Sequence, residues 1–249
     1  MFYEFIIKAI YSKTLCEGDL SIDGGVNKGL HTFPMSESVG LSGFVLGFEA
    51  LPNLTDTVNS KILSNNINNI KVVNKAVGSS IGITNFTYVP DADGFSGIKE
   101  RSGIPEHAKT SIVNLSVPLT TMDHEVNILN FNKPVRFIKL DLEGGEYDAL
   151  MGASVIMRDH APLIIFENGR NSSLTLYGYD KESWFALFES NEYKLYDLFG
   201  RDFTPNEWHA GEMPWYFIAV KRDVDLEFIK NELVTIIENI FNEHADKLN

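Results

Sequence analysis

The sequence is poor in cysteine and in signals for secretion or membrane insertion. A single cysteine, Cys16, among 249 residues excludes an intramolecular disulfide and is typical of a reducing compartment. The apolar N-terminus is interrupted by Glu4 and Lys8, and it lacks the basic start and small-residue cleavage site of a signal peptide. No apolar stretch is long enough for a transmembrane helix. We therefore expect a cytoplasmic protein without a membrane span.

Positive charge is also scarce. The chain has 21 Lys and Arg against 34 Asp and Glu, which gives a net charge of −13, and it contains no run of basic residues. An acidic protein repels a phosphate backbone, so we expect no nucleic-acid partner. The 44% hydrophobic and 22% charged composition is that of a globular protein. The length favours one domain over residues 1–249.

What the sequence does contain is an alternation of apolar runs and helical periodicities. The runs that predict strands are 20–23, 43–49, 71–77, 135–141 and 162–167, followed by a closing pair at 194–199 and 215–220. Between two of them, Leu54, Val58 and Ile62 recur every fourth residue, as on one face of a helix. This order predicts an α/β fold with a mostly parallel sheet and right-handed crossovers. The carboxyl ends of parallel strands share one rim, so Asp23, Glu49 and residues 76–78 should meet there.

Three segments fall outside this rhythm. Residues 81–134 predict a β-rich insertion before the fourth core strand, with a candidate lid over the ligand site. Residues 1–17 predict a docking helix. Residues 223–246 predict one long amphipathic helix, which either packs on the body of the domain or joins a homo-oligomer.

A glycine-rich turn follows the first strand. Gly24, Gly25 and Gly29 come after Asp23 and before an expected helix. Glycine permits a positive φ and a close approach of a ligand, and a helix N-terminus adds exposed N–H groups. The stretch favours a pocket floor for a nucleoside-type or anionic ligand, with an ordinary structural turn as the alternative.

Five motifs together resemble one family. They are Asp23-Gly-Gly-Val-Asn-Lys-Gly29, Phe48-Glu-Ala-Leu-Pro52, Ala76-Val-Gly78, Ile138-Lys-Leu-Asp-Leu-Glu-Gly-Gly-Glu146 and Ile164-Ile-Phe-Glu167. In this order and spacing they are similar to the FkbM family of S-adenosylmethionine-dependent methyltransferases. The resemblance implies a three-layer, Rossmann-like class I methyltransferase fold, whose seven-stranded, mostly parallel sheet has an antiparallel last strand. It also implies S-adenosylmethionine as donor and a hydroxyl of a sugar, glycan precursor or related natural product as acceptor.

The resemblance also assigns cofactor-binding residues. They are Asp23, Gly24, Gly25, Asn27, Gly29, Glu49, Ala76, Val77 and Asp141. The turn would pass close to the methionine and ribose parts of the donor. Glu49 suits a bidentate hydrogen bond to the two ribose hydroxyls, because a carboxylate accepts from two vicinal O–H donors. Val77 would contact the adenine.

Catalysis at an alcohol needs a general base or a metal ion, because a hydroxyl is a poor nucleophile at pH 7. Asp141, Glu143 and Glu167 are the candidate catalytic carboxylates, with Asp141 the first choice. Glu146 is expected to begin a helix instead, where the dipole favours an acid. The rival bases are His31, His107, His124 and His209.

A divalent cation such as Mg²⁺ is a second way to activate the acceptor. Asp141, Glu167 and Asn168 would supply the oxygen ligands that Mg²⁺ prefers. The layout is similar to that of catechol-type O-methyltransferases, with Glu167 in place of an Asp.

Other functions remain open at this stage. They are N-methylation of an amino sugar, a nicotinamide-dependent oxidoreductase, and a non-catalytic nucleoside-binding domain. The oxidoreductase is disfavoured because Asn27 stands at the second glycine position of the dinucleotide fingerprint. The strand-end acids disfavour a decayed site.

Overall fold

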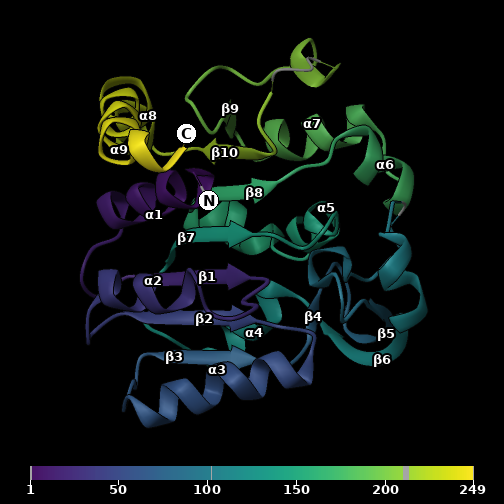
Figure 1. Ribbon diagram of the computed structural model, residues 1–249. Coiled ribbons are helices and arrows are strands. Elements are labelled where there is room, and N and C mark those ends of the chain that lie inside the picture. The colour runs from purple at the N-terminus through teal and green to yellow at the C-terminus, as the bar shows by residue number, and fades with distance from the viewer. Residues whose placement is uncertain (1, 102, 210–212, 249) are drawn as a thin grey trace.

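The centre of the protein is a seven-stranded sheet with the strand order β3-β2-β1-β7-β8-β10-β9 (Figure 1). This computed structural model describes residues 2–101, 103–209 and 213–248. The strands of the sheet are β1 (Leu20–Gly24), β2 (Phe44–Phe48), β3 (Ile70–Val73), β7 (Val135–Leu140), β8 (Leu163–Glu167), β9 (Lys194–Asp197) and β10 (Tyr216–Val220). In this sheet β10 runs antiparallel to both of its neighbours, and the other six strands run in one direction. The expected mostly parallel α/β sheet with an antiparallel last strand is therefore confirmed.

Helices cover both faces of this sheet, which makes three layers. One face carries α1 (Phe2–Thr14), α2 (Thr32–Val39), α3 (Pro52–Ser64), α8 (Asp223–Asn231) and α9 (Leu233–Leu248). The other face carries α4 (Met122–Leu129), α5 (Glu146–Met151) and α7 (Lys181–Ser190). Because both faces are covered, the central strands are apolar almost throughout; all residues of β1 and β10 are buried.

The register of the central strands aligns their carboxyl ends. Asp23 pairs with Gly47 on one side and with Lys139 on the other, and Gly24 pairs with Phe48 and Leu140. The residues that follow β1, β2 and β7 therefore leave the sheet side by side. This alignment places the predicted strand-end acids on one rim.

The segment between β3 and β7 forms a second, smaller sheet. Its strands are β4 (Ala76–Val77), β5 (Gly82–Tyr88) and β6 (Val113–Thr120), in the order β4-β6-β5. It lies off the carboxyl edge of the main sheet (Figure 1). The single strand predicted over 71–77 is thus divided between two sheets. Asn74 holds the turn between them, because its side-chain amide donates to the carbonyl oxygens of Glu49 and Ala50 at 2.9 and 3.2 Å.

The C-terminal region differs from the expected single helix over 223–246. The helix is interrupted at Glu232, which separates α8 from α9. On both sides of the interruption side chains remain buried in one apolar cluster, as Phe228, Leu233 and Ile240 show.

Five further short elements complete the description. They are α6 (Asn171–Tyr177), a π-helical turn (Ile156–His160) and short 3₁₀ turns at Asp93–Phe95, Glu106–Ser111 and Glu207–His209. Among the described residues, no helix has the length and apolar character that crossing a membrane requires. Residues 1, 102, 210–212 and 249, which the predicted single domain includes, lie outside the described residues.

Candidate functional site

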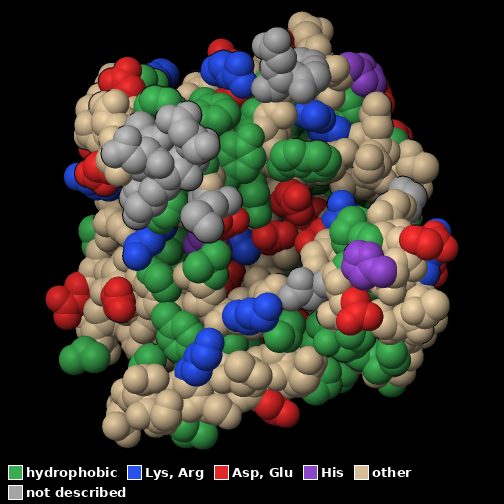
Figure 2. All heavy atoms as spheres, viewed as in Figure 1, with side chains coloured by type: hydrophobic (Ala, Val, Ile, Leu, Met, Phe, Trp, Pro, Cys, Tyr) green, Lys and Arg blue, Asp and Glu red, His purple; other side chains and the backbone are tan. Residues whose placement is uncertain are grey.

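A cavity of about 550 Å³ opens at the carboxyl edge of the main sheet. Figure 2 shows acidic side chains gathered in a hollow on this face of the molecule. The residues that line the cavity come from α1, from the segments after β1, β2 and β7, from β4 and β5, and from the loop after β5. Its volume is in the range of small-molecule and cofactor sites, roughly 300–1,000 Å³.

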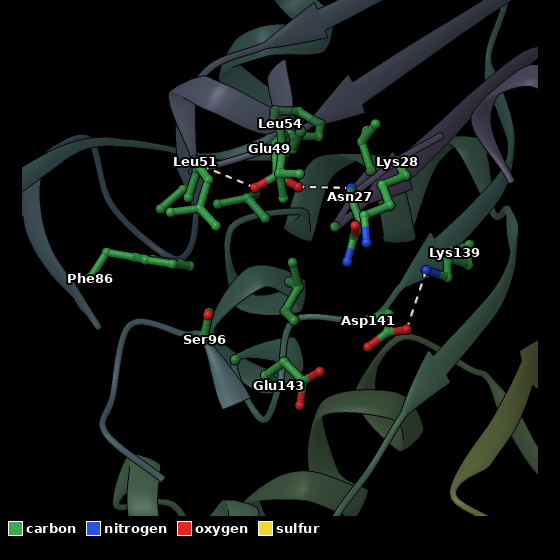
Figure 3. A pocket seen from close by; sticks show the side chains of 18 of the residues that line it. Asn27, Lys28, Glu49, Leu51, Leu54, Phe86, Ser96, Lys139, Asp141 and Glu143 are labelled. Atoms are coloured by element: carbon green, nitrogen blue, oxygen red, sulfur yellow. Dashed lines mark hydrogen bonds and ion pairs between the residues drawn. The ribbon is translucent and has the colours of Figure 1, made fainter. Parts of the chain in front are cut away.

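One end of the cavity is built around Glu49, directly after β2. Its Oε2 accepts from the backbone N–H of Asn27 at 2.8 Å, and its Oε1 accepts from that of Leu51 at 2.9 Å (Figure 3). Burial raises the pKa of Glu49, and these two N–H donors work in the opposite direction. A carboxylate has about four lone-pair sites, so two remain for a ligand. The apolar side chains of Leu51, Val77 and Phe86 line the same end.

The glycine-rich turn contributes fewer cavity residues than the sequence predicts. Gly25, Asn27, Glu49, Ala76, Val77 and Asp141 line the cavity, whereas Asp23, Gly24 and Gly29 do not. The last three support the turn: the Asp23 carboxylate accepts from the Thr32 hydroxyl at 2.6 Å, and a Cβ at Gly24 or Gly29 would collide with Leu140 or Phe33.

Gly25 and Asn27 set the path of the turn. A Cβ on Gly25 would lie 2.1 Å from the carbonyl oxygen of Asp141, so only glycine lets the ends of β1 and β7 approach this closely. Asn27 has φ 50°, a left-handed conformation that asparagine tolerates better than most residues. The close approach brings Asp141 to the cavity wall.

A buried lysine, which sequence reasoning missed, lies beneath Asp141. Lys139 is 3% exposed, and its Nζ lies 3.5 Å from Asp141 Oδ2 and 3.9 Å from Asp23 Oδ1. Tyr216 donates its hydroxyl to Asp141 Oδ2 at 2.8 Å. Burial opposes ionisation of Asp141, but Lys139 and Tyr216 outweigh it and hold its pKa below the usual range. The sequence signal that could have identified Lys139 is a lysine within an apolar strand, two residues before an acid.

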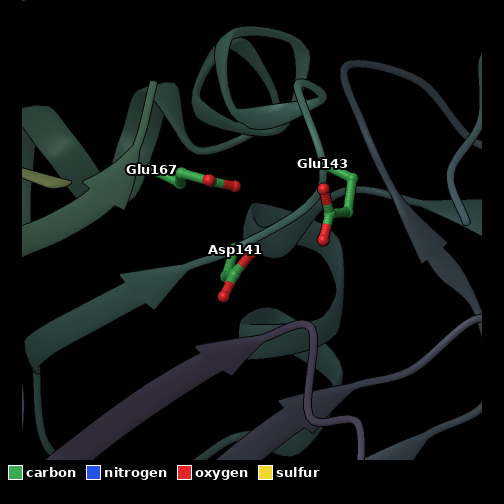
Figure 4. Close-up of side chains that lie close together, drawn as sticks. All are labelled: Asp141, Glu143 and Glu167. Atoms are coloured by element: carbon green, nitrogen blue, oxygen red, sulfur yellow. The ribbon is translucent and has the colours of Figure 1, made fainter. Parts of the chain in front are cut away.

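Three carboxylates converge beside this lysine. Asp141, Glu143 and Glu167 each offer an oxygen, and these oxygens lie within 4.8 Å of one another (Figure 4). Glu143 has φ 56°, which is strained for a residue with a side chain. Arg101, from the loop after β5, forms an ion pair with Glu143. The cluster thus joins β7, β8 and the insertion.

The two strand-end acids of this cluster titrate far apart. Burial and the neighbouring Asp141 charge raise the pKa of Glu167 to about 8, so Glu167 keeps its proton at neutral pH while Asp141 is ionised. Two carboxyl groups whose environments separate their pKa values are typical of an acid–base site.

Asn168 directly follows Glu167, and its place in a cation site stays a prediction. It is 2% exposed, and its Oδ1 accepts from the backbone N–H of Arg170 at 2.7 Å, where it serves the turn after β8. Among the His, Cys, Asp and Glu side chains of the described residues, Asp141, Glu143 and Glu167 form the group that could hold a cation.

Glu146 and the histidines also have defined places. Glu146 begins α5 and is 2% exposed; its carboxylate accepts from the backbone N–H groups of Leu142 and Gly144. Burial raises its pKa to about 7. His31 lines the cavity and contacts Glu4, another residue that sequence reasoning missed. His107, His124 and His209 are not among the lining residues.

Comparison with known proteins identifies the family. The methyltransferase FkbM domain pattern matches residues 23–195, which is more than half of the chain. The chain belongs to the FkbM methyltransferase family. A search of curated protein sequences finds no significant match.

Two solved structures are similar to this FkbM methyltransferase domain. A Clostridium thermocellum protein named as a candidate rRNA methylase matches with a TM-score of 0.50 and 12% identity, over 86% of this chain and 92% of that one. The FkbM methyltransferase of Methylobacillus flagellatus matches with a TM-score of 0.49 and 16% identity, over 84% of this chain but only 47% of that one. The class I methyltransferase fold is confirmed, and these low identities carry no information on the acceptor.

The cavity suits the donor that this family of methyltransferases uses. S-adenosylmethionine has an apolar base, a ribose with two vicinal hydroxyls, and a charged amino-acid end. The cavity offers an apolar end, a buried carboxylate with free lone pairs, and a charged end at Lys139 and Asp141. Each part of S-adenosylmethionine therefore has a matching group of residues in the cavity.

Proposed function

We propose that this methyltransferase transfers a methyl group from S-adenosylmethionine to a hydroxyl of a sugar, glycan precursor or related natural product. The observation that carries the proposal is the convergence of Asp141, Glu143 and Glu167 beside the charged end of the cavity. Several carboxylate oxygens on one wall suit an acceptor that presents several hydroxyl donors.

The donor would lie along the cavity with its ribose at Glu49. The two free lone pairs of Glu49 accept from the ribose hydroxyls, while its other two hold Asn27 and Leu51 in place. Val77 and Phe86 give the adenine an apolar wall. We further propose Gly25, Ala76 and Asp141 as donor contacts, with Asp23, Gly24 and Gly29 shaping the turn that carries them.

Glu167 is the proposed general base. The bound donor supplies a methyl group that is already activated as a sulfonium, so the protein must align the acceptor and remove its proton. Asp141 is held ionised by Lys139 and Tyr216, which makes it a weak base but a good hydrogen-bond acceptor for positioning. The hydroxyl proton passes to the Glu167 carboxylate as the new C–O bond forms and the C–S bond breaks. A base with a pKa near the working pH is the most effective one.

A divalent cation on Asp141, Glu143 and Glu167 is the competing mechanism. Two cationic side chains, Lys139 and Arg101, already contact two members of this cluster. These contacts favour the base mechanism, because much of the cluster charge is compensated by the chain itself. Activity that survives dialysis against EDTA supports the base, whereas loss in EDTA with recovery in Mg²⁺ would establish the cation.

The test of the proposed function is a methyl-transfer screen. The acceptors are nucleotide sugars, glycan fragments and amino sugars, and mass spectrometry of the products locates the methyl group. We expect O-methylated products from the wild type. Glu167→Gln should lower kcat by roughly 10²–10⁴-fold but keep binding of S-adenosylhomocysteine. Glu182→Gln, with its 79% exposed side chain on α7, is the matched control.

The rival functions predict other results, either in this screen or in binding calorimetry. An N-methylated product would show that the amine of an amino sugar, and not a hydroxyl, is the methyl acceptor. Calorimetric binding of NAD without binding of S-adenosylhomocysteine would indicate an oxidoreductase. Binding of S-adenosylhomocysteine with no turnover on any acceptor would favour a non-catalytic domain.

A further inference from the structure

The N-terminal helix α1 reaches the cavity, although it lies outside the matched family region of residues 23–195. Glu4, in the first turn of α1, lines the cavity together with His31. The helix is fixed against the sheet by Ile6, Ile7 and Ile10, which are fully buried. The position of Glu4 is therefore set by the packing of an apolar face rather than by a loose terminus.

Glu4 is tied to the charged end of the cavity by direct contacts. His31 Nε2 lies 2.5 Å from Glu4 Oε2, and this partner holds the pKa of Glu4 below its usual range. On the same helix, the ring of Tyr3 packs edge-on against Tyr216 at 6.2 Å between centroids. Tyr216 in turn donates to Asp141. The helix, the histidine and the strand-end acid thus form one connected wall.

Acidic side chains surround Lys139 on this wall. Three acids, Glu4, Asp23 and Asp141, act on Lys139, and His31 is the partner of Glu4. Asp23 is 1% exposed and its Oδ1 has no hydrogen-bond partner among the described residues. A carboxylate at the cavity wall accepts further hydrogen bonds, so Glu4 favours a ligand group that donates them.

We propose that Glu4 binds the α-ammonium group of the donor, so that α1 completes the methyltransferase site. The inference rests on the proposed function. Figure 3 shows Lys139 and Asp141 across the cavity from Leu51 and Phe86, where the ribose and adenine would lie. The amino-acid part of an elongated donor then extends toward Lys139, Asp141 and the neighbouring Glu4. Its ammonium group donates to the Glu4 carboxylate.

The test compares two ligands that differ only at this end. S-adenosylhomocysteine carries the ammonium and carboxylate groups, whereas 5′-methylthioadenosine has neither. Calorimetry measures the Kd of both ligands for the wild type and for Glu4→Gln, which keeps the side-chain shape. We expect Glu4→Gln to weaken S-adenosylhomocysteine about tenfold or more, because a hydrogen bond between charged groups is lost, and to leave 5′-methylthioadenosine within about twofold.

Glu17→Gln is the matched control, because Glu17 follows α1, is exposed and does not line the cavity. It should change neither Kd. Equal weakening of both ligands by Glu4→Gln, or no change in either, would overturn the role of Glu4 and leave the donor site standing. A wild type that binds neither ligand would instead overturn the proposed function itself.

Discussion

The proposed functional residues of this protein are acids whose neighbours hold them in different protonation states. Asp141 is kept ionised by a buried lysine and a tyrosine hydroxyl, whereas Glu167 shares its environment with the Asp141 charge and keeps its proton. In the proposed mechanism, acidic residues of one cluster thus serve both as a positioning group and as a base. The difference arises from partners, not from exposure, since both side chains are half-buried.

The pH dependence of activity tests Glu167. A base must be deprotonated to act, and the pKa of Glu167 is raised to about 8, so the active fraction grows as pH rises toward that value. We expect kcat/KM to rise about tenfold per pH unit below about pH 8 and then to level off. Glu167→Gln should lower kcat by roughly 10²–10⁴-fold and abolish the rise. A pH profile with the same rise in Glu167→Gln would assign the titration to another group.

The stability of the buried cluster tests Lys139. Lys139→Met leaves Asp23 and Asp141 without their cation, and breaking a buried pair costs about 3–5 kcal/mol of unfolding free energy. The loss should be largest at neutral pH and should shrink in acid, because the Asp141 carboxyl group, whose pKa Lys139 lowers in the wild type, can then take up a proton. Urea denaturation at several pH values measures it. Lys8→Met, exposed on α1, is the control that should change little.

At the scale of elements, the site depends on parts of the chain that are distant in sequence. Glu49 and Asp141 directly follow β2 and β7, and Glu167 is the last residue of β8. Glu4 and Arg101 come from a helix and a loop that pack onto the strand ends. Arg101 also lies over the ring of Phe95, which joins the loop after β5 to Glu143. The insertion is therefore a proposed lid that is tied to the carboxylate cluster by one ion pair.

The anchoring of the C-terminal helices gives a prediction at this scale. Asp225, 1% exposed in the first turn of α8, receives two hydrogen bonds from the Arg136 guanidinium of β7, at 3.0 and 2.5 Å. We expect Asp225→Asn to lower the unfolding free energy by roughly 3 kcal/mol, because a buried pair is broken, with an unchanged Kd for S-adenosylhomocysteine. Asp223→Asn, exposed in the same turn, is the control. A changed Kd would mean that α8 is coupled to the donor site.

For the whole molecule, donor binding should appear as thermal stability. A ligand at 100 times its Kd stabilises the folded state by about 2.7 kcal/mol, and a chain of this size gains roughly 2–4 °C in Tm per kcal/mol. We expect S-adenosylhomocysteine to raise Tm by about 5–10 °C. At the same concentration, Glu49→Ala should lose most of this gain and the exposed-site control Glu189→Ala should keep it. A similar gain with NAD would contradict the donor assignment.

Much of the fold was predictable because it depends on local patterns. Apolar runs of strand length between helical periodicities predict a covered parallel sheet, and the acids Glu49, Asp141 and Glu167 are visible because each follows such a run. The division of residues 71–77 between two sheets was not predictable. Strand propensity is the same on both sides of Asn74, and only the carbonyl groups that its side chain meets decide the turn.

The sequence by itself determined the α/β order, the family and the strand-end acids, because periodicity and motifs act over a few neighbouring residues. Only the tertiary structure decided which charges meet. In the sequence, Lys139 is one residue of a strand, and only the pairing of β1 with β7 brings it close to Asp23. No local pattern marks Glu4, because its contact with His31 depends on how α1 packs. Coulomb energies and burial depend on distances between residues that are remote in sequence. The protonation states of Asp141 and Glu167 are therefore set by the tertiary structure.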